Sequence, residues 1–117
     1  MKNNIHYTLA ARRDLDGIWD YIVLELQNRS AAERVVNRIL DAVDKLEHFP
    51  QMGAPLSSIA DNKEDYRFLV SGSYMVFYRV NGQDVYVDRV LYGRRDYLNV
   101  LFRELPDETA TEESKPL

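Results

Sequence analysis

Residues 66–93 read YRFLVSGSYMVFYRVNGQDVYVDRVLYG, and this stretch decides the fold class. Apolar and polar side chains alternate along it, as in half-buried strands, in three runs: Tyr66–Ser71, Tyr74–Val80 and Asp84–Tyr92. Gly72-Ser73 predicts a tight turn between the first two runs. Asn81-Gly82 predicts a type I′ hairpin between the last two, since both central residues of that turn need positive φ. The stretch therefore predicts a three-stranded antiparallel meander.

The same alternation assigns side chains to the two faces of the sheet. Tyr74 and Tyr78 should share one face of the middle strand. In the last strand, strict alternation places Val85 and Val87 on one face and Val90 on the other.

Two helical periodicities precede the meander. A short strand is predicted first, because three apolar residues alternate with polar ones: Ile5, Tyr7 and Leu9. The first helix follows, and its apolar stripe is spaced at i, i+3, i+4, i+7 and i+11: Leu15, Ile18, Trp19, Ile22 and Leu26. Ser30-Ala31-Ala32-Glu33 predicts a capping box that starts a second helix. That helix should run to about His48, because Phe49-Pro50 disfavours helical backbone. The short link predicts an antiparallel helical hairpin.

The C-terminal end of the sequence divides at Pro106. Asp96–Leu105 can form a short helix with Leu98, Leu101 and Phe102 facing inward. Residues 106–117 are acidic and poor in apolar side chains, so we expect a disordered tail. Residues 1–105 should then form one α+β domain, with the helices packed on one face of a mostly antiparallel sheet.

Composition restricts the chemistry that this chain can carry. It has 117 residues and no cysteine, which excludes a disulfide framework and thiol catalysis. His6 and His48 have no spacing typical of metal ligands, so we expect structural roles for both, no metal site and no cofactor. The sequence contains neither a signal-peptide pattern nor an apolar run long enough to cross a membrane. We therefore expect a cytoplasmic protein with no membrane partner.

Charge is distributed unevenly along the chain. The formal net charge of −4 argues against a non-specific nucleic-acid binder. Tyr66–Phe102, however, carries five arginines against three aspartates, a net charge of 5 − 3 = +2. Arginine suits bidentate contacts with carboxylate or phosphate better than lysine does. This half of the domain is therefore the candidate contact region for an acidic partner.

Four segments carry a resemblance to a known family. Residues 11–22 read ARRDLDGIWDYI, residues 46–53 read LEHFPQMG, residues 66–80 read YRFLVSGSYMVFYRV and residues 91–96 read LYGRRD. In this order they resemble the RelE/ParE superfamily, the toxins of bacterial type II toxin–antitoxin pairs, over roughly residues 5–102. The resemblance implies the RelE/ParE-like fold: a strand, a helical hairpin, the three-stranded meander and a short C-terminal helix.

The superfamily contains two activities, and the sequence resembles one more closely. RelE-like toxins cleave mRNA on the ribosome, whereas ParE-like toxins inhibit DNA gyrase without known catalysis. Arg67 and Arg95 match basic positions of the nucleases. Leu69 stands where a catalytic lysine is expected, and Met75 where a phosphate-binding arginine is expected; near the last strand, Tyr92 precedes glycine where the nucleases carry histidine. Arginine is a poor acid or base, so the catalytic set is incomplete.

The resemblance thus implies a ParE-like, non-catalytic toxin that binds gyrase and that a cognate antitoxin neutralises by laying a segment in a groove beside the sheet. A homodimer or a toxin–antitoxin hetero-oligomer would be compatible with this role. The residues that we expect to contact the antitoxin or the target are Arg67, Tyr74, Arg79, Arg94 and Arg95.

Two alternatives stay open. The first is a ribosome-dependent mRNA endoribonuclease that uses Arg67 and Arg95, with Tyr92 or Tyr97 assisting. The second is a homologue that has lost toxicity and only binds an antitoxin.

Overall fold

The computed structural model describes residues 2–55 and 66–93. Helices and strands follow in the order β1 (Asn4–Tyr7), α1 (Leu9–Asp20), the π-helix η1 (Tyr21–Glu25), α2 (Arg29–Asp44), the 3₁₀-helix η2 (Lys45–Glu47), β2 (Ala54–Pro55), β3 (Tyr66–Ser71), β4 (Tyr74–Asn81) and β5 (Asp84–Tyr92). The predicted strand, helical hairpin and meander are confirmed, and β2 adds a short strand that the sequence did not indicate. The predicted C-terminal helix and acidic tail lie outside the described residues.

The strands form one mixed sheet of five strands in the order β1-β5-β4-β3-β2. The meander supplies the antiparallel pairs β3–β4 and β4–β5, and β2 pairs antiparallel with β3. β1 is the exception, because Asn4–Tyr7 pairs parallel with residues 84–87 of β5. The class is therefore α+β with a mostly antiparallel sheet, as predicted.

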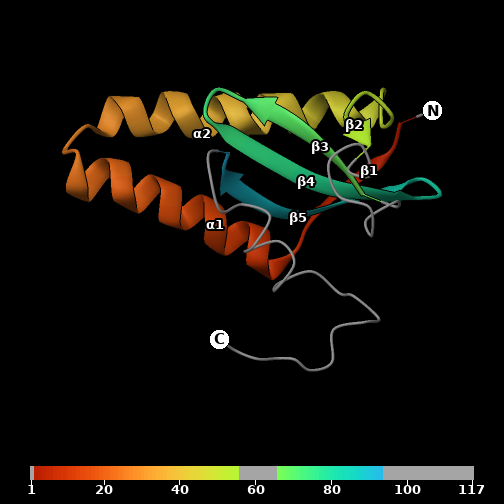
Figure 1. The fold of residues 1–117 in the computed structure, drawn as a ribbon, viewed down its shortest axis with the longest axis horizontal. Coiled ribbons are helices and arrows are strands. Elements are labelled where there is room, and N and C mark those ends of the chain that lie inside the picture. The colour runs from red at the N-terminus through yellow and green to blue at the C-terminus, as the bar shows by residue number, and fades with distance from the viewer. Residues whose placement is uncertain (1, 56–65, 94–117) are drawn as a thin grey trace.

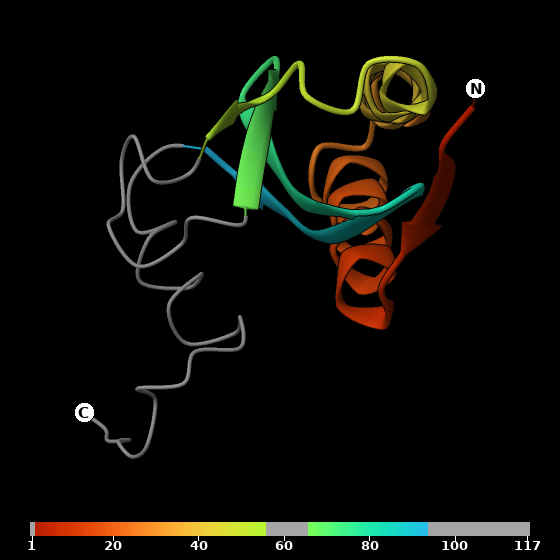
Figure 2. The same ribbon diagram turned by 90° about the vertical axis from the view of Figure 1, so that its right-hand side faces the viewer.

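α1 and α2 form a hairpin that packs on one face of this sheet (Figures 1 and 2). The core between the two layers contains fully buried side chains from α2, η2, β4 and β5: Ile39, Val43, Leu46, Val76, Tyr78, Val85 and Val87. Tyr74, Val76, Tyr78 and Val80 of β4 all belong to this cluster or pack against it, so the predicted faces of the middle strand are confirmed. The helix hairpin thus covers one face of the meander.

Both α-helices begin at a side-chain cap. The Thr8 Oγ1 accepts a hydrogen bond from the Ala11 amide at 3.1 Å, so α1 begins at Leu9. The predicted assignment of Leu9 to the first strand is wrong, since the cap ends β1 and leaves Leu9 exposed. The Asn28 Oδ1 caps α2 by accepting from the Ala31 amide at 3.0 Å. The predicted Ser30 capping box is also wrong, because Ser30 lies inside the helix and donates to Asn28.

In both hairpin turns, the first of the two central residues is a glycine with positive φ. Gly72 has φ +61° between Ser71 and Tyr74, and Gly82 has φ +63° between Asn81 and Asp84. Positive φ at the first central residue alone is the pattern of type II′, not type I′. The hairpin at Asn81-Gly82 is confirmed, but its predicted turn type is wrong because Asn81 is the last residue of β4.

A β-bulge breaks the alternation in β5. Phe77 pairs with Arg89 while Tyr78 pairs with Val87, which leaves Asp88 as the extra residue. The bulge rotates the rest of the strand, so Val90 joins Val85 and Val87 in the helix-facing core. The predicted placement of Val90 on the opposite face is therefore wrong.

The first helix unwinds before its apolar stripe ends. α1 passes into the π-helix η1, and Gln27 then adopts φ 52°, which turns the chain toward α2. Leu26 is therefore 56% exposed, whereas the periodicity placed it in the core. α2 continues into η2, which ends at Glu47 with His48 as its C-cap, so the predicted end at about His48 is confirmed. No helix among residues 2–55 and 66–93 is long and apolar enough to cross a membrane.

Candidate partner-binding groove

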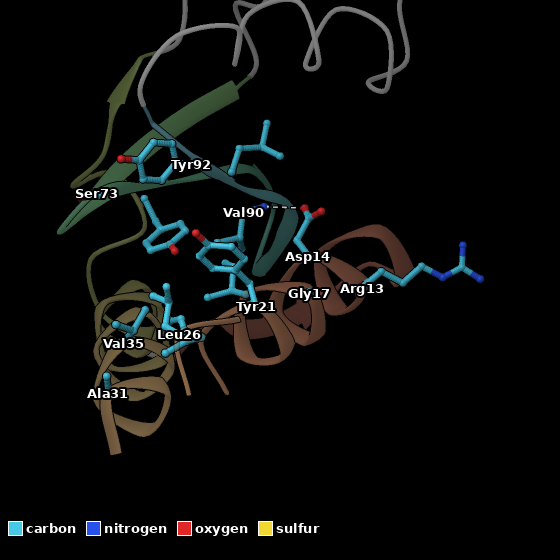
Figure 3. Close-up of a pocket in the computed structure, with 14 residues that line it drawn as sticks. Arg13, Asp14, Gly17, Tyr21, Leu26, Ala31, Val35, Ser73, Val90 and Tyr92 are labelled. Atoms are coloured by element: carbon cyan, nitrogen blue, oxygen red, sulfur yellow. Dashed lines mark hydrogen bonds between the residues drawn. The ribbon is translucent and has the colours of Figure 1, made fainter. Parts of the chain in front are cut away.

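A largely apolar groove of about 840 Å³ opens where the first helix, the start of α2 and the ends of β4 and β5 meet (Figure 3). It is lined by Arg13, Asp14, Gly17, Ile18, Tyr21, Ile22, Leu26, Ala31, Val35, Ser73, Tyr74, Val90, Leu91 and Tyr92. Tyr21, Leu26 and Tyr92 are each more than half exposed, so large apolar surfaces line an open depression. Such a surface on a small protein marks an interaction site.

Three tyrosines, Tyr21, Tyr74 and Tyr92, line the groove. The rings of Tyr74 and Tyr92 meet edge to face with centroids 5.7 Å apart, and Tyr21 approaches them from η1. Burial, with smaller contributions from Tyr92 and Tyr21, raises the pKa of the Tyr74 hydroxyl. The Tyr74 phenol therefore stays neutral at physiological pH. The three tyrosines offer apolar area together with hydroxyl groups to a bound chain.

Asp14 fixes the wall of the groove that β5 supplies. Its carboxylate accepts from Arg89 Nε at 2.7 Å, from Arg89 Nη2 at 2.9 Å and from the Val90 amide at 2.8 Å. The side chains of Asp14 and Arg89 are 14% and 12% exposed, so the pair is bidentate and largely buried. β1 pairs with residues 84–87 of β5 and does not extend past the bulge. Beyond the bulge, the Asp14 carboxylate accepts the hydrogen bond of the Val90 amide in place of a strand partner. The carboxylate thereby holds the end of β5 against α1.

Arg67, one of the predicted site residues, is held by the backbone of the segment that follows η2. Its Nη1 donates to the carbonyl oxygens of Gly53 at 2.7 Å and Gln51 at 3.3 Å. The Tyr78 hydroxyl completes this anchor, because it accepts from the Gly53 amide and donates to the Pro50 carbonyl, both at 2.9 Å. Burial raises the pKa of Tyr78 despite the opposing effects of Gly53 and Arg67. In this structure Arg67 contributes to the fold.

Arg79 lies on the other face of the sheet and is also paired. Its Nε donates to the Asp88 carboxylate at 2.8 Å, and its guanidinium lies 4.6 Å from the centre of the Tyr86 ring. Burial raises the pKa of Tyr66, and Asp88 raises it further. His6 continues this row, since it stacks on Tyr86 with centroids 4.9 Å apart. Carboxylate, phenol and guanidinium here form a satisfied network.

The structure brings only part of the predicted set together. Tyr74 and Tyr92 are neighbours in the groove. Arg67 pairs with Tyr78, four residues along β4 from Tyr74, so it lies about 13 Å further along that strand and one strand away. Arg94, Arg95 and Tyr97 lie outside the described residues. The roles predicted from the sequence stay predictions for all seven site residues: Arg67, Tyr74, Arg79, Tyr92, Arg94, Arg95 and Tyr97.

Sequence reasoning did not select Tyr21, Leu26 or Asp14 as site residues. Leu26 fits the apolar stripe of the first helix, which predicts a place in the core, and Asp14 falls outside that stripe. The only sequence signal for an exposed Leu26 was the Asn28-Arg29 pair, which interrupts the helical pattern just after it. Within the described ranges, no three His, Cys, Asp or Glu side chains lie close enough to hold a metal ion.

Comparison with known proteins identifies the family. The family model described as the ParE toxin of the type II toxin–antitoxin system parDE matches residues 5–97. Protein Y4kP of Sinorhizobium fredii is 36% identical over 100 residues, which cover 86% of this chain and 98% of that protein. Toxin ParE1 of Mycobacterium tuberculosis is 33% identical over 88 residues, which cover 74% of this chain and 86% of the toxin.

Among solved structures, a chain of the chromosomal ParDE toxin–antitoxin system of Pseudomonas aeruginosa superposes with a TM-score of 0.64 at 25% identity. The match covers 80% of this chain and 98% of that chain. The residues that the family model matches include most of the first strand, the helical hairpin and the meander. The chain therefore belongs to the ParE family of toxins of type II toxin–antitoxin systems.

Proposed function

We propose that this ParE-family toxin arrests growth by binding DNA gyrase in the cytoplasm, without catalysis, and that a cognate antitoxin neutralises it by placing an apolar segment in the tyrosine-lined groove. The groove is the observation that carries the antitoxin half of the proposal. The gyrase half rests on the family and on the incomplete nuclease set. Residues 1–105 would form the toxin domain, with residues 106–117 as an acidic tail.

The groove has the chemistry expected of a protein-binding site. Its exposed residues Tyr21, Leu26 and Tyr92 provide apolar area for a partner, and its tyrosine hydroxyls can bond to a partner's backbone. Arg13 extends outward from α1 at one end of the groove, where it can meet an acidic side chain (Figure 3). An amphipathic segment with apolar anchors and an acidic end would fit these features.

The three described arginines of the meander support a binding role over RNA cleavage. Arg67 is held by backbone carbonyls, and Arg79 and Arg89 each contact a carboxylate. These three guanidinium groups have different protein partners and do not converge on the groove. Stabilising a phosphoryl transition state requires cations aimed at one point, with a separate acid and base. Arg94 and Arg95 are the remaining basic candidates for contacts with the target or the antitoxin.

Leu26 and Leu24 provide a matched pair for testing the groove. They are 56% and 67% exposed on the same short segment, but only Leu26 lines the groove. If the antitoxin buries Leu26, Leu26→Ala should weaken antitoxin binding about tenfold, since roughly 1 to 1.5 kcal/mol of apolar burial is lost. Leu26→Asp should weaken it a hundredfold or more, and Leu24→Asp less than threefold. Titration calorimetry with the antitoxin encoded beside the toxin gene measures this, and equal effects of the two aspartates would reject the groove.

The gyrase proposal needs a separate assay. Purified toxin should inhibit DNA supercoiling by gyrase in a concentration-dependent manner, and added antitoxin should reverse the inhibition. After induction without antitoxin, labelling of DNA should fall before labelling of protein. Arg94→Ala/Arg95→Ala should weaken the inhibition or the neutralisation without changing the unfolding transition. Early loss of protein synthesis with cleaved transcripts would instead establish the nuclease alternative, and a well-expressed folded toxin without growth arrest would establish the non-toxic one.

A further inference from the structure

α1 has a glycine in its interior, because Gly17 lies well inside the helix that runs from Leu9 to Asp20. Glycine weakens a helix, since it loses more backbone freedom on folding than any other residue. A fold retains an interior glycine where the backbone needs positive φ, or where another segment approaches too closely for a side chain. Neither reason applies to Gly17 in the described part of this fold.

The backbone of Gly17 is that of an ordinary α-helix. Among the described glycines only Gly72 and Gly82 have positive φ, and the Gly17 carbonyl accepts from the Tyr21 amide in the usual i+4 pattern. The space beside Gly17 is open as well. Apart from the adjoining residues and the helix's own backbone, no atom of the described part of the chain would lie within 4 Å of a Cβ placed there. These residues would therefore accept alanine at position 17, with a more stable helix.

Gly17 is exposed on the wall that α1 contributes to the groove (Figure 3). Arg13, Gly17 and Tyr21 are spaced at i, i+4 and i+8, so they form one row along the helix surface. Along the helix axis, Gly17 lies about 6 Å from each of the other two. Both neighbours carry long side chains, and the missing side chain leaves a gap between them. We call this gap the Gly17 notch.

The two sides of the notch differ in chemistry. On one side Tyr21 is 53% exposed and belongs to the apolar part of the groove. On the other side Arg13 is exposed, and it forms no ion pair with a residue of the described ranges. A partner that lies along this row thus meets an aromatic ring, an open stretch of helix backbone and a guanidinium, in that order, over about 12 Å.

We propose that the Gly17 notch seats one large apolar side chain of the antitoxin, next to the carboxylate that meets Arg13. This inference rests on the proposed function, because it specifies how the partner of the same groove is recognised. In the notch an apolar side chain would contact the α1 backbone and the flank of Tyr21, and it would be largely desolvated, as central interface anchors are. A Cβ at position 17 would occupy that space. The glycine thus weakens the helix of the free toxin and gives the complex a close contact.

Gly17→Ala separates this role from a structural one, because its two expected effects have opposite signs. The full-length variant should melt about 2 to 6 °C higher, since alanine favours the helix. In titration calorimetry with the antitoxin encoded beside the toxin gene, it should nevertheless bind about fivefold more weakly, and Gly17→Leu about a hundredfold more weakly. Asp16→Ala and Asp16→Leu are the matched controls, because Asp16 is exposed but does not line the groove. Both should change the affinity less than about threefold.

Arg13 and Arg12 provide a matched test of the charge beside the notch. Both are exposed on the same turn of α1, but only Arg13 lines the groove. Arg13→Glu should weaken antitoxin binding about thirtyfold, and Arg12→Glu less than about fivefold. The affinity of Arg13→Glu should also depend less steeply on salt than that of the wild type. Equal losses in the two variants would reject the carboxylate contact with Arg13.

Three results would overturn the notch as an antitoxin contact. The first is unchanged antitoxin affinity in Gly17→Ala and Gly17→Leu; the groove itself would still stand if Leu26→Asp weakens binding, and would be rejected with the notch if it does not. The second is a lower melting temperature of Gly17→Ala, which would show that the fold itself needs the glycine. The third is loss of gyrase inhibition or of self-association in Gly17→Leu with intact antitoxin affinity, which would assign the notch to the target or to a second copy of the chain.

Discussion

Replacing Asp14 should cost this domain a large part of its stability. The carboxylate accepts two hydrogen bonds from Arg89 and one from the Val90 amide, at 2.7 to 2.9 Å. Asp14→Ala would leave a guanidinium and an amide without this acceptor at a largely buried position. Breaking a buried pair from one side costs about 3 to 5 kcal/mol. A domain of this size should then melt roughly 12 °C lower or more.

Two further variants separate charge from hydrogen bonding. Asp14→Asn keeps an oxygen for the Val90 amide but loses the charge, so it should lose less, about 2 to 3 kcal/mol. Arg89→Met removes the cation, and in Asp14→Ala/Arg89→Met no charge remains to be stabilised. The double variant should therefore be more stable than the sum of the single losses predicts, by at least about 2 kcal/mol of coupling.

Urea unfolding followed by circular dichroism measures these free energies. The slope of the free energy of unfolding against urea should stay constant across the series, so that midpoints can be compared. A loss below about 1 kcal/mol for Asp14→Ala, or additive losses in the double variant, would refute the assignment of Asp14 as the residue that holds the end of β5.

Three other predictions follow from local contacts. Burial and the charge of Asp44 raise the pKa of Tyr7 to about 12, so the unfolded chain loses this proton first and the stability of the fold should decrease between about pH 10 and 12. Over that pH range the urea midpoint of Tyr7→Phe should decrease less than that of the wild type. Equal decreases in the two proteins would contradict the role of Tyr7. Gly53→Ala should lose about 2 to 3 kcal/mol in thermal melts, because its Cβ would lie 2.6 Å from the Tyr78 hydroxyl; an unchanged melting temperature would contradict the packing there. Asn28→Ala should lose about 1 kcal/mol as a lost helix cap and Ser30→Ala less than 0.5 kcal/mol, and the reverse order would restore the capping box.

The meander was predictable because its signals are local. Alternation and two glycine turns define three strands within 28 residues, and each turn needs only its own neighbours to form. The errors at Leu9 and Val90 arose where a contact from a distant segment decided the outcome. Thr8 donates to the Asp88 carbonyl and Asp14 accepts from the Val90 amide, at the bulge that strict alternation could not anticipate.

The groove was harder to predict than the sheet. The sequence predicts Tyr74 as a partner contact and Tyr92 only as an assisting phenol of the nuclease alternative, and both line the groove. The opposite wall comes from Tyr21 and Leu26, more than 40 residues earlier in the chain. The periodicity of the first helix assigned Leu26 to the core, because a regular α-helix would have turned it inward. The π-helix and the positive φ of Gln27 turn it outward instead, and neither has a signal in the sequence.

The parallel pairing of β1 with β5 has a consequence for how the toxin is made. β1 is synthesised first, yet its strand partner begins 80 positions later, at Asp84 opposite Asn4. The entropy of closing so long a loop must be offset before this contact contributes, so the N-terminal strand should join the sheet late in folding. During translation, the helical hairpin can form from local contacts, whereas the sheet waits until β5 has left the ribosome. A nascent chain would thus be harmless until β5 has emerged, and the time between its emergence and sheet closure is when an antitoxin already present could capture it.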